Sequence, residues 1–357
     1  MRMNVPSIAA LTCYYQYAYD MAIMASKVTS LTRVSFVQLA SGTTLLCSLG
    51  ALPRRSVAQT LEQLIVGVMP IDSAGQVYYA HDLGYFKRAG IESKIVPFSN
   101  GATNATAVLS DSVDVGFSNV VSLAVAHLRG LPVTILASGP MSYGFNAAGH
   151  TAPTAGILAV KKSSPYRKAE DLNGKTIAVS GLANLPQLAV RAWIDKNGGD
   201  SATAKFVELP LSVMSSAVQA GRVDAASLDS NFDPTFGKYD DPLRRLASAY
   251  DAVSKNFCPA VWFTTTGWAT KNPTLLKKFV SIMDESAIWA NRHQKDSAEI
   301  LGKYTHQSPD QIDATVRVIY GEKLTSDMIQ PNIDIAAKYG VIKSGFPAHE
   351  LISSFAL

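Results

Sequence analysis

From residue 64 onward, short apolar runs alternate with segments whose apolar residues recur at the helical period. The run 64–69 has the length of a strand, and Tyr79, Leu83 and Phe86 after it lie on one face of a helix that ends near Gly90. The alternation continues with strands predicted at 91–98, 113–117 and 132–137 and with helices ending near Val108 and Gly130. Strands separated by helices of this length predict right-handed crossovers and a largely parallel sheet.

A second series of the same kind begins after residues 139–154, which are rich in Gly, Ala and Pro and are expected to form a loop. Ser212 is expected to cap one of its helices, and Asn272-Pro273 has the N-cap and first-position residues of another. Strands are predicted at 157–160, 175–179, 206–209, 223–228 and 259–265, with a helical apolar stripe over 185–192. The last of these strands is expected to return the chain to the first series.

The two series predict an α/β fold of two lobes joined by two crossings, near residues 154–160 and 259–268. Two crossings permit hinge bending, so the lobes are expected to close on a ligand. We assign residues 1–58 to a leader, 59–156 and 264–357 to lobe 1, and 157–263 to lobe 2.

The leader has the order of a signal peptide. Lys27 and Arg33 precede an apolar stretch at 34–52, and Ser56-Val57-Ala58 is a small-residue cleavage site before Gln59. Two features are atypical of a signal peptide: Arg54 and Arg55 follow the apolar stretch, and 26 residues lie upstream of the basic region. Two alternatives therefore stay open. Translation begins at Met21 or Met24, or the leader has no targeting role. We expect export to the periplasm.

Composition narrows the class of function. The net charge is +4 and no long basic run occurs, which argues against a nucleic-acid partner. Cys13 and Cys47 lie in the leader, so Cys258 alone can form neither an internal disulfide nor a thiolate metal cluster. The six histidines have no metal-ligand spacing and no catalytic motif occurs, so we expect no metal, no cofactor and no catalysis.

Four stretches carry a family resemblance: LGYFKRAGI at 83–91, DLNGKTIAV at 171–179, AGRVDAA at 220–226 and KNP at 271–273. Their order and spacing over about residues 64–300 resemble the nitrate/sulfonate/taurine-type solute-binding family, which includes binders of thiamine pyrimidine precursors. The resemblance implies a periplasmic-binding-protein-like (type II) fold and a mostly monomeric periplasmic protein. Such a protein delivers a small molecule to the permease and ATPase of an ABC importer.

The candidate ligand site lies in loops after the carboxyl ends of the predicted strands. Small polar residues and glycines there expose backbone N–H groups at helix N-termini, which hold a carboxylate, sulfonate or phosphate without an arginine. The alternative for Ser118 and Asn119 is that they only cap the following helix. The candidates are Asp72, Ser73, Gln76, Asn100, Gly101, Thr103, Ser118, Asn119, Ser138 and Gly139 in lobe 1, and Ser180, Gly181, Leu182, Pro210, Leu211, Asp229 and Asn231 in lobe 2.

Aromatic residues near these loops offer a stacking surface for a planar ligand, although core packing is the alternative for each; they are Tyr78, Tyr143, Phe145 and Phe232. Asp229, if it faces the cleft, would repel an anion and favour a ligand with an amine or hydroxyl donor; the alternative is that it is solvated or caps the following turn. We expect the protein to capture a small, acidic organic ligand. A ligand that also contains a planar ring is one of the possibilities left open. Two alternative functions remain. One is an enzyme on the same fold that acts on a pyrimidine or aromatic metabolite, although the cysteine-rich stretch of the thiamine-pyrimidine synthase is absent here. The other is a ligand-sensing partner of a membrane receptor.

Overall fold

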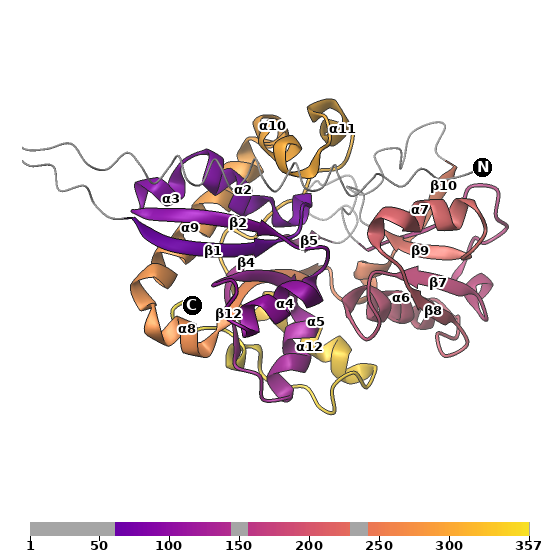
Figure 1. The fold of residues 1–357 in the computed structure, drawn as a ribbon. Coiled ribbons are helices and arrows are strands. Elements are labelled where there is room, and N and C mark those ends of the chain that lie inside the picture. The colour runs from indigo at the N-terminus through magenta and orange to yellow at the C-terminus, as the bar shows by residue number, and fades with distance from the viewer. Residues whose placement is uncertain (1–60, 144–155, 229–241, 357) are drawn as a thin grey trace, which may run out of the picture. The chain divides into compact units, whose positions relative to one another are not determined.

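The computed structural model describes residues 61–143, 156–228 and 242–356, and Figure 1 shows its mixed α/β architecture. The strands are β1 Glu62–Val68, β2 Ile91–Pro97, β3 Gly116–Asn119, β4 Val133–Ser138, β5 Ser142–Tyr143, β6 Ile157–Lys161, β7 Thr176–Val179, β8 Lys205–Glu208, β9 Ala225–Leu228, β10 Leu243–Ser248, β11 Asn256–Phe257 and β12 Ala260–Thr265. The α-helices are α2 Gly75–Asp82, α3 Tyr85–Arg88, α4 Gly101–Leu109, α5 Val120–Leu128, α6 Leu185–Lys196, α7 Leu211–Gln219, α8 Thr266–Lys271, α9 Pro273–Arg292, α10 Gln294–Thr305, α11 Pro309–Asp313 and α12 Ser326–Lys338. Short 3-10 turns are η1 Asp72–Ala74, η3 Ala169–Leu172, η5 Ala249–Ala252 and η6 Ala348–Glu350.

The first sheet consists of β2, β1, β3, β12 and β4 in that order. β1 and β2 are parallel. A parallel bridge between Val66 of β1 and Val115, the residue before β3, places β3 next to β1. β12 lies between β3 and β4 and is antiparallel to both. Residues 260–263, which the sequence analysis placed in lobe 2, therefore pair with strands of the first sheet.

The second sheet has the order β8-β7-β9-β6-β10. β7 is parallel to β8 and β9, whereas β6 is antiparallel to β9 and β10. Each sheet thus has one strand of opposite direction, β12 or β6, and both are mixed rather than largely parallel. β10 was not predicted, because its sequence LRRLAS lacks the apolar pattern of a strand.

The two sheets are built on one plan that the sequence analysis did not detect as a repeat. Asp114, just before β3, accepts a hydrogen bond from the backbone N–H of Ile65 in β1 (2.7 Å). Asp224, just before β9, accepts one from the N–H of Thr176 in β7 (2.9 Å). Each aspartate thus ties the strand that follows it to a parallel neighbour, β3 to β1 and β9 to β7, so the same polar contact occurs in both sheets.

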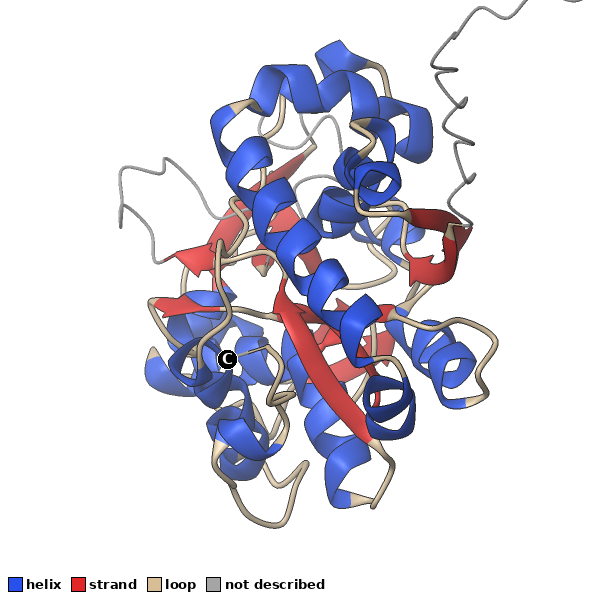
Figure 2. Ribbon diagram, turned by 90° about the vertical axis from the view of Figure 1, so that its left-hand side faces the viewer, coloured by secondary structure: helices blue, strands red, loops and turns tan. Residues whose placement is uncertain are grey.

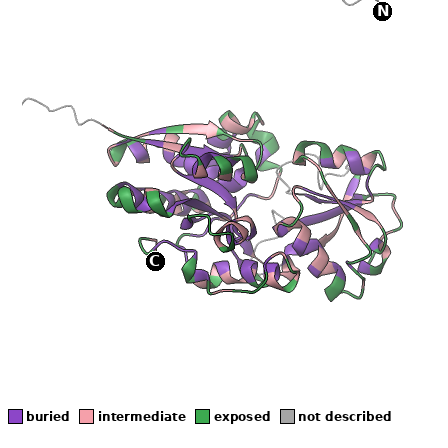
Figure 3. Cartoon of the chain, turned by 60° about the horizontal axis from the view of Figure 1, so that its bottom comes forward, coloured by how far each residue is buried: buried purple, intermediate pink, exposed green. Residues whose placement is uncertain are grey.

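Buried apolar residues lie on both faces of each sheet. Figure 3 marks the buried stretches of both sheets in purple. One face of the first sheet packs on α2, α9 and α10, and the long α9 crosses the strands in Figure 2. The other face packs on α4, α5 and α12. In the second sheet α6 and α7 contribute to different apolar clusters. None of the helices among the described residues has both the length and the hydropathy needed to cross a membrane.

Helix termini differ from the sequence expectations at three places. The stripe predicted as one helix before Gly90 is two helices, because Gly84 adopts a left-handed conformation (φ 74°) between α2 and α3. α7 is capped by Pro210 rather than Ser212. Asn272 does occupy the N-cap of α9, but its side chain makes no capping hydrogen bond and donates instead to the carbonyl of Trp268 (3.0 Å).

A half-buried carboxyl on α9 gives a pH-dependent prediction. Burial raises the pKa of Asp284 to about 6, with Lys323 opposing the shift. Because the pKa is raised in the folded state, this group lowers stability as pH rises through the interval from about 4 to about 6. Asp284→Asn should stabilise the protein at pH 7.5 by about 1 kcal/mol, a value reduced for solvent screening, with a smaller gain at pH 4.5.

Thermal unfolding at both pH values tests this, with the exposed Asp313→Asn as a control. A gain that does not decrease on acidification would contradict the assignment.

Candidate functional site

β12 brings together two candidate residues that are 20 positions apart in the sequence. Val261 of β12 pairs with Ser118 of β3 on one side and with Ser138 of β4 on the other. Nearby, the N–H of Val120 donates to the carbonyl of Pro259 (3.2 Å), and the N–H of Gly139 lies 3.4 Å from Cys258 Sγ. The carboxyl ends of β3 and β4 are therefore held at one edge of the first sheet by the turn into β12.

Ser118 and Ser138 differ in how their hydroxyls are satisfied. Ser138 Oγ donates to the carbonyl of Gly321 (2.6 Å). Ser118 is completely buried, yet its Oγ has no hydrogen-bond partner among the described residues. Buried hydroxyls are nearly always paired, so an unpaired one at the carboxyl end of a strand is a candidate for binding an external partner.

The first turn of α4 lies against Ser118. A Cβ built on Gly101 would come within 3.2 Å of Ser118 Oγ, so a side chain at position 101 would press on the hydroxyl. Glycine here keeps the space next to Ser118 Oγ free of side-chain atoms from α4.

Two helices present N-terminal amides near Ser118. Asn100 Oδ1 caps α4 by accepting from the N–H of Thr103 (2.9 Å), and Asn119 Oδ1 caps α5 by accepting from that of Ser122 (2.9 Å). Within the described part of the chain, no acceptor bonds the first-turn N–H groups of Gly101, Ala102 and Val121. The capping role considered for Asn119 is thus present, and amide donors remain beside it.

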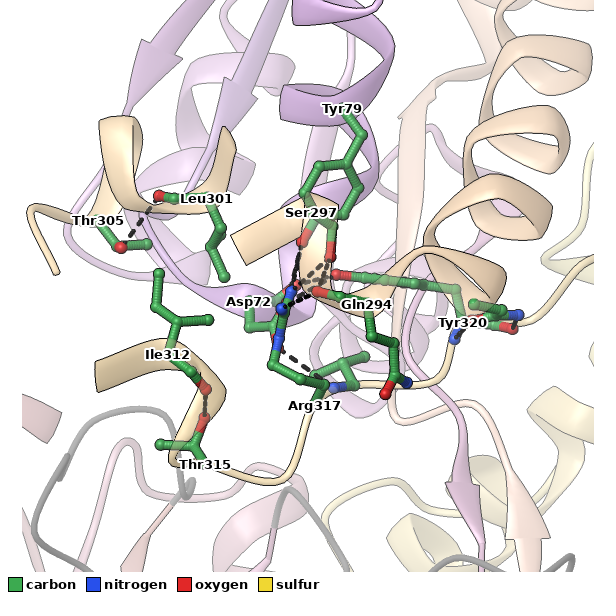
Figure 4. A network of polar contacts seen from close by, with 12 residues as sticks. Asp72, Tyr79, Gln294, Ser297, Leu301, Thr305, Ile312, Thr315, Arg317 and Tyr320 are labelled. Carbon is green, nitrogen blue, oxygen red and sulfur yellow. Dashed lines mark hydrogen bonds and ion pairs between the residues drawn. The ribbon is translucent and has the colours of Figure 1, made fainter. Parts of the chain in front are cut away.

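Asp72 has a structural role instead of the expected ligand contact. It is 2% exposed, and its Oδ2 accepts from Arg317 Nε (2.9 Å) in a buried ion pair. Its Oδ1 accepts from Arg317 Nη2 (3.2 Å) and from the hydroxyls of Tyr79 (3.2 Å) and Tyr320 (3.1 Å), as Figure 4 shows. We therefore remove Asp72 from the ligand contacts.

Gln76 and Tyr78 are corrected in the same way. Gln76 is fully buried, accepts from Trp262 Nε1 (2.9 Å) and donates to the carbonyl of Met283 (3.4 Å). Tyr78 is 1% exposed, donates to the carbonyl of Met69 (3.0 Å) and stacks on Tyr304. For Tyr78 the core alternative is the correct one. These side chains follow β1 as expected, but Gln76 contacts Met283 of α9 and Tyr78 stacks on Tyr304 of α10.

Arg317 is the residue whose importance sequence reasoning missed. It is separated from Asp72 by 245 positions and lies in no recognisable motif. It also donates to the carbonyl of Gln294 (2.7 Å) and to Ser297 Oγ (3.0 Å), which anchors the segment before Tyr320. That segment bonds the loop after β4, since the N–H of Met141 donates to the carbonyl of Ile319 (2.7 Å). No local sequence signal predicts this long-range pair.

The remaining lobe 1 candidates are placed as follows. Ser73 is buried in η1. Thr103 is exposed, and its Oγ1 donates to the carbonyl of Asn100 (2.9 Å). Gly139 is buried, and the nearby carbonyl of Ala260 leaves no room for a Cβ on it. Tyr143 is partly buried at the end of β5. Phe145 lies outside the described residues.

In the second sheet, Ser180, Gly181 and Leu182 follow β7 as predicted. Leu182 is 50% exposed and its N–H donates to Glu208 Oε2 (3.2 Å) at the end of β8. Pro210 and Leu211 begin α7. Asp229, Asn231 and Phe232 lie outside the described residues, so their expected ligand contacts stay predictions.

Two observations bear on chemistry. Burial raises the pKa of the Cys258 thiol to about 12, so this group stays a neutral thiol at physiological pH and is a poor nucleophile. Across the described residues, no group of three or more His, Cys, Asp or Glu side chains is arranged to hold a metal ion. What the first sheet does offer at Ser118 is a set of neutral hydrogen-bond donors.

The family model described as NMT1/THI5 like matches residues 72–297, more than half of the chain. The chain belongs to this family. The match confirms the resemblance seen in the sequence and covers most of both sheets, from η1 to the start of α10. No significant match was found among curated protein sequences.

Solved structures confirm the periplasmic-binding-protein-like fold of this NMT1/THI5-like chain. The periplasmic aliphatic sulphonate binding protein of Escherichia coli has a TM-score of 0.64 and 15% identity, over 82% of this chain and 92% of that one. The periplasmic nitrate-binding protein of Synechocystis gives 0.67 and 10%, over 83% and 86%. The ligand binding component of an ABC-type import system from Staphylococcus aureus, solved with zinc bound, gives 0.68 and 13%, over 82% and 96%.

The buried ion pair should dominate local stability. Arg317→Met leaves the Asp72 carboxylate buried and unpaired, which should cost about 3–5 kcal/mol of unfolding free energy. Arg88→Met breaks the exposed pair with Glu285 (2.7 Å) and should cost under about 1 kcal/mol. Urea unfolding of both variants tests the contrast, and equal losses would show that Asp72 does not depend on its partner.

Proposed function

We propose that the protein is an extracytoplasmic solute-binding protein of an ABC importer that captures a small organic acid and catalyses no reaction. Family membership and the fold support the general function. The observation that carries the ligand assignment is the buried, unpaired hydroxyl of Ser118 beside the first turns of α4 and α5.

The acid group of the ligand would be held by neutral groups. Ser118 Oγ–H and the free N–H groups of Gly101, Ala102 and Val121 are donors, and the positive ends of two helices add to their attraction for an anion. Asp72, a candidate carboxylate considered from the sequence, is paired with Arg317 and buried in the protein. Its charge therefore does not repel an anion at Ser118.

Capture would use both sheets. We propose that they are the cores of two lobes connected by the segments before β6 and before β11, and that the lobes close by hinge bending. The ligand would lie between the loops after β3 and β4 and those after β7 and β8. Since β12 belongs to the first sheet, the second crossing would lie between β10 and β11, earlier than the sequence suggested.

Location and partners follow from this function. We propose that the leader 1–58 directs export to the periplasm, where a monomer delivers the ligand to a membrane permease and its ATPase. The names of the three similar structures, two periplasmic and one a component of an import system, support this proposal.

Ser118→Ala tests the ligand assignment. In a thermal-shift screen of sulfonates, carboxylates and aromatic acids on protein beginning at Gln59, a binder raises the melting temperature of the wild type. The variant should bind that compound about 10- to 100-fold more weakly, because a hydrogen bond to a charged acceptor contributes about 1.5–3 kcal/mol. Without ligand, the variant should be as stable as the wild type or more so, because an unsatisfied buried hydroxyl has been removed.

A matched control is Ser286→Ala. Ser286 is also fully buried, but its Oγ donates to the carbonyl of Gln76 (2.6 Å). This variant should lose stability and keep its affinity. If Ser118→Ala keeps full affinity, the ligand assignment to Ser118 is wrong; if a bound compound is turned over, the proposal of a protein without catalysis is wrong.

A further inference from the structure

Asn184 occupies the N-cap position of α6, at the end of the loop that follows β7 in the second sheet. Asparagines are common at this position because their side-chain oxygen accepts an N–H of the first helical turn. Asn100 and Asn119 do this for α4 and α5. Asn184 does not: its side chain makes no capping hydrogen bond, although α6 has 12 residues.

The side-chain amide of Asn184 also has no hydrogen-bond partner elsewhere among the described residues. Its Oδ1 is buried without a hydrogen-bond partner. Asn104 and Asn332 share that property among the described residues, but each uses Nδ2 to donate to two backbone carbonyls. For Asn184 the described part of the chain provides no partner at either end of the amide.

The loop before α6 holds the side chain in this arrangement. A Cβ on Gly181 would lie 2.4 Å from Asn184 Nδ2, so a larger residue at position 181 would displace the amide from this position. The side chain of Gln187 bonds back to the N–H of Ala183 (2.6 Å), and Pro186 lacks the N–H that a cap would otherwise receive. The first turn of α6 is thus completed without the Asn184 side chain.

We propose that Asn184 is a specificity-determining ligand contact from the second sheet, and that its Oδ1 accepts a hydrogen bond from a hydroxyl or N–H group of the ligand. This inference rests on the proposed function and complements Ser118, which is unpaired at the corresponding edge of the first sheet. A carbonyl acceptor cannot bind the acid group itself. The ligand is therefore an organic acid with a separate neutral donor.

The test uses two pairs of compounds that differ only by a hydroxyl in place of a methyl group. They are 2-hydroxyethanesulfonate with propane-1-sulfonate, and 4-hydroxybenzoate with 4-methylbenzoate. Calorimetric affinities are measured for the wild type, Asn184→Ala and Asn184→Asp. The control is Asn272→Ala, since Asn272 is also an N-cap residue without a capping bond but lies before α9.

The wild type should bind the hydroxyl member of a pair about tenfold more tightly than the methyl member, as expected for one buried hydrogen bond. Asn184→Ala should remove this preference and change the affinity for the methyl member less than twofold. Asn184→Asp keeps an acceptor, so it should retain the preference while binding both acids more weakly. Asn272→Ala should behave as the wild type does.

An equal loss for both members of a pair, or an unchanged preference in Asn184→Ala, overturns the role of Asn184 and leaves the proposed function standing. The second result would mean that water satisfies the amide. If the wild type binds no member of either pair while Ser118→Ala also has no effect in the wider screen, the proposed function itself fails.

Discussion

The arrangement of the candidate site depends on the insertion of β12 between β3 and β4. This strand returns from the second sheet and pairs through Val261 with both Ser118 and Ser138. Without it, β3 and β4 would each lack one neighbour, and their carboxyl ends would have no fixed spacing. Because β12 is separated from β3 by the whole second sheet in the sequence, the site in the first sheet forms only when the chain has completed the second.

Buried polar groups in the first sheet and in the segment after β1 are divided between two uses. Asp72, Gln76 and Ser138 are buried with their hydrogen bonds complete, and they hold distant segments together. Ser118 is buried with none. A buried unpaired hydroxyl lowers stability by about 1–3 kcal/mol, a cost that a binding protein recovers when the ligand supplies the missing partner. Sites of this kind are expected to be less stable than the scaffold around them.

Much of this fold could be predicted from the sequence because its signals are local. Apolar periodicity located most strands and helices, and Gly-containing turns such as Gly90 located helix ends. The two series of alternating strands and helices predicted the two lobes, and the family resemblance implied the same fold. Long-range features had no local signal: the pairing of Asp72 with Arg317, the direction of β12 and the edge strand β10 all depend on contacts between distant segments. Most candidate residues follow the strands that the sequence predicted, but the direction in which each side chain points was not encoded in the pattern. Gln76 and Tyr78 are buried in the core, and Asn184 was not among the candidates.

The most direct measurement of the central claim is a crystal structure of the protein with the tightest-binding acid from the screen. The account predicts that an oxygen of the acid group lies within hydrogen-bonding distance of Ser118 Oγ and of a first-turn N–H of α4 or α5. An acid group held instead by arginine or lysine side chains, with Ser118 Oγ still unpaired, would contradict it.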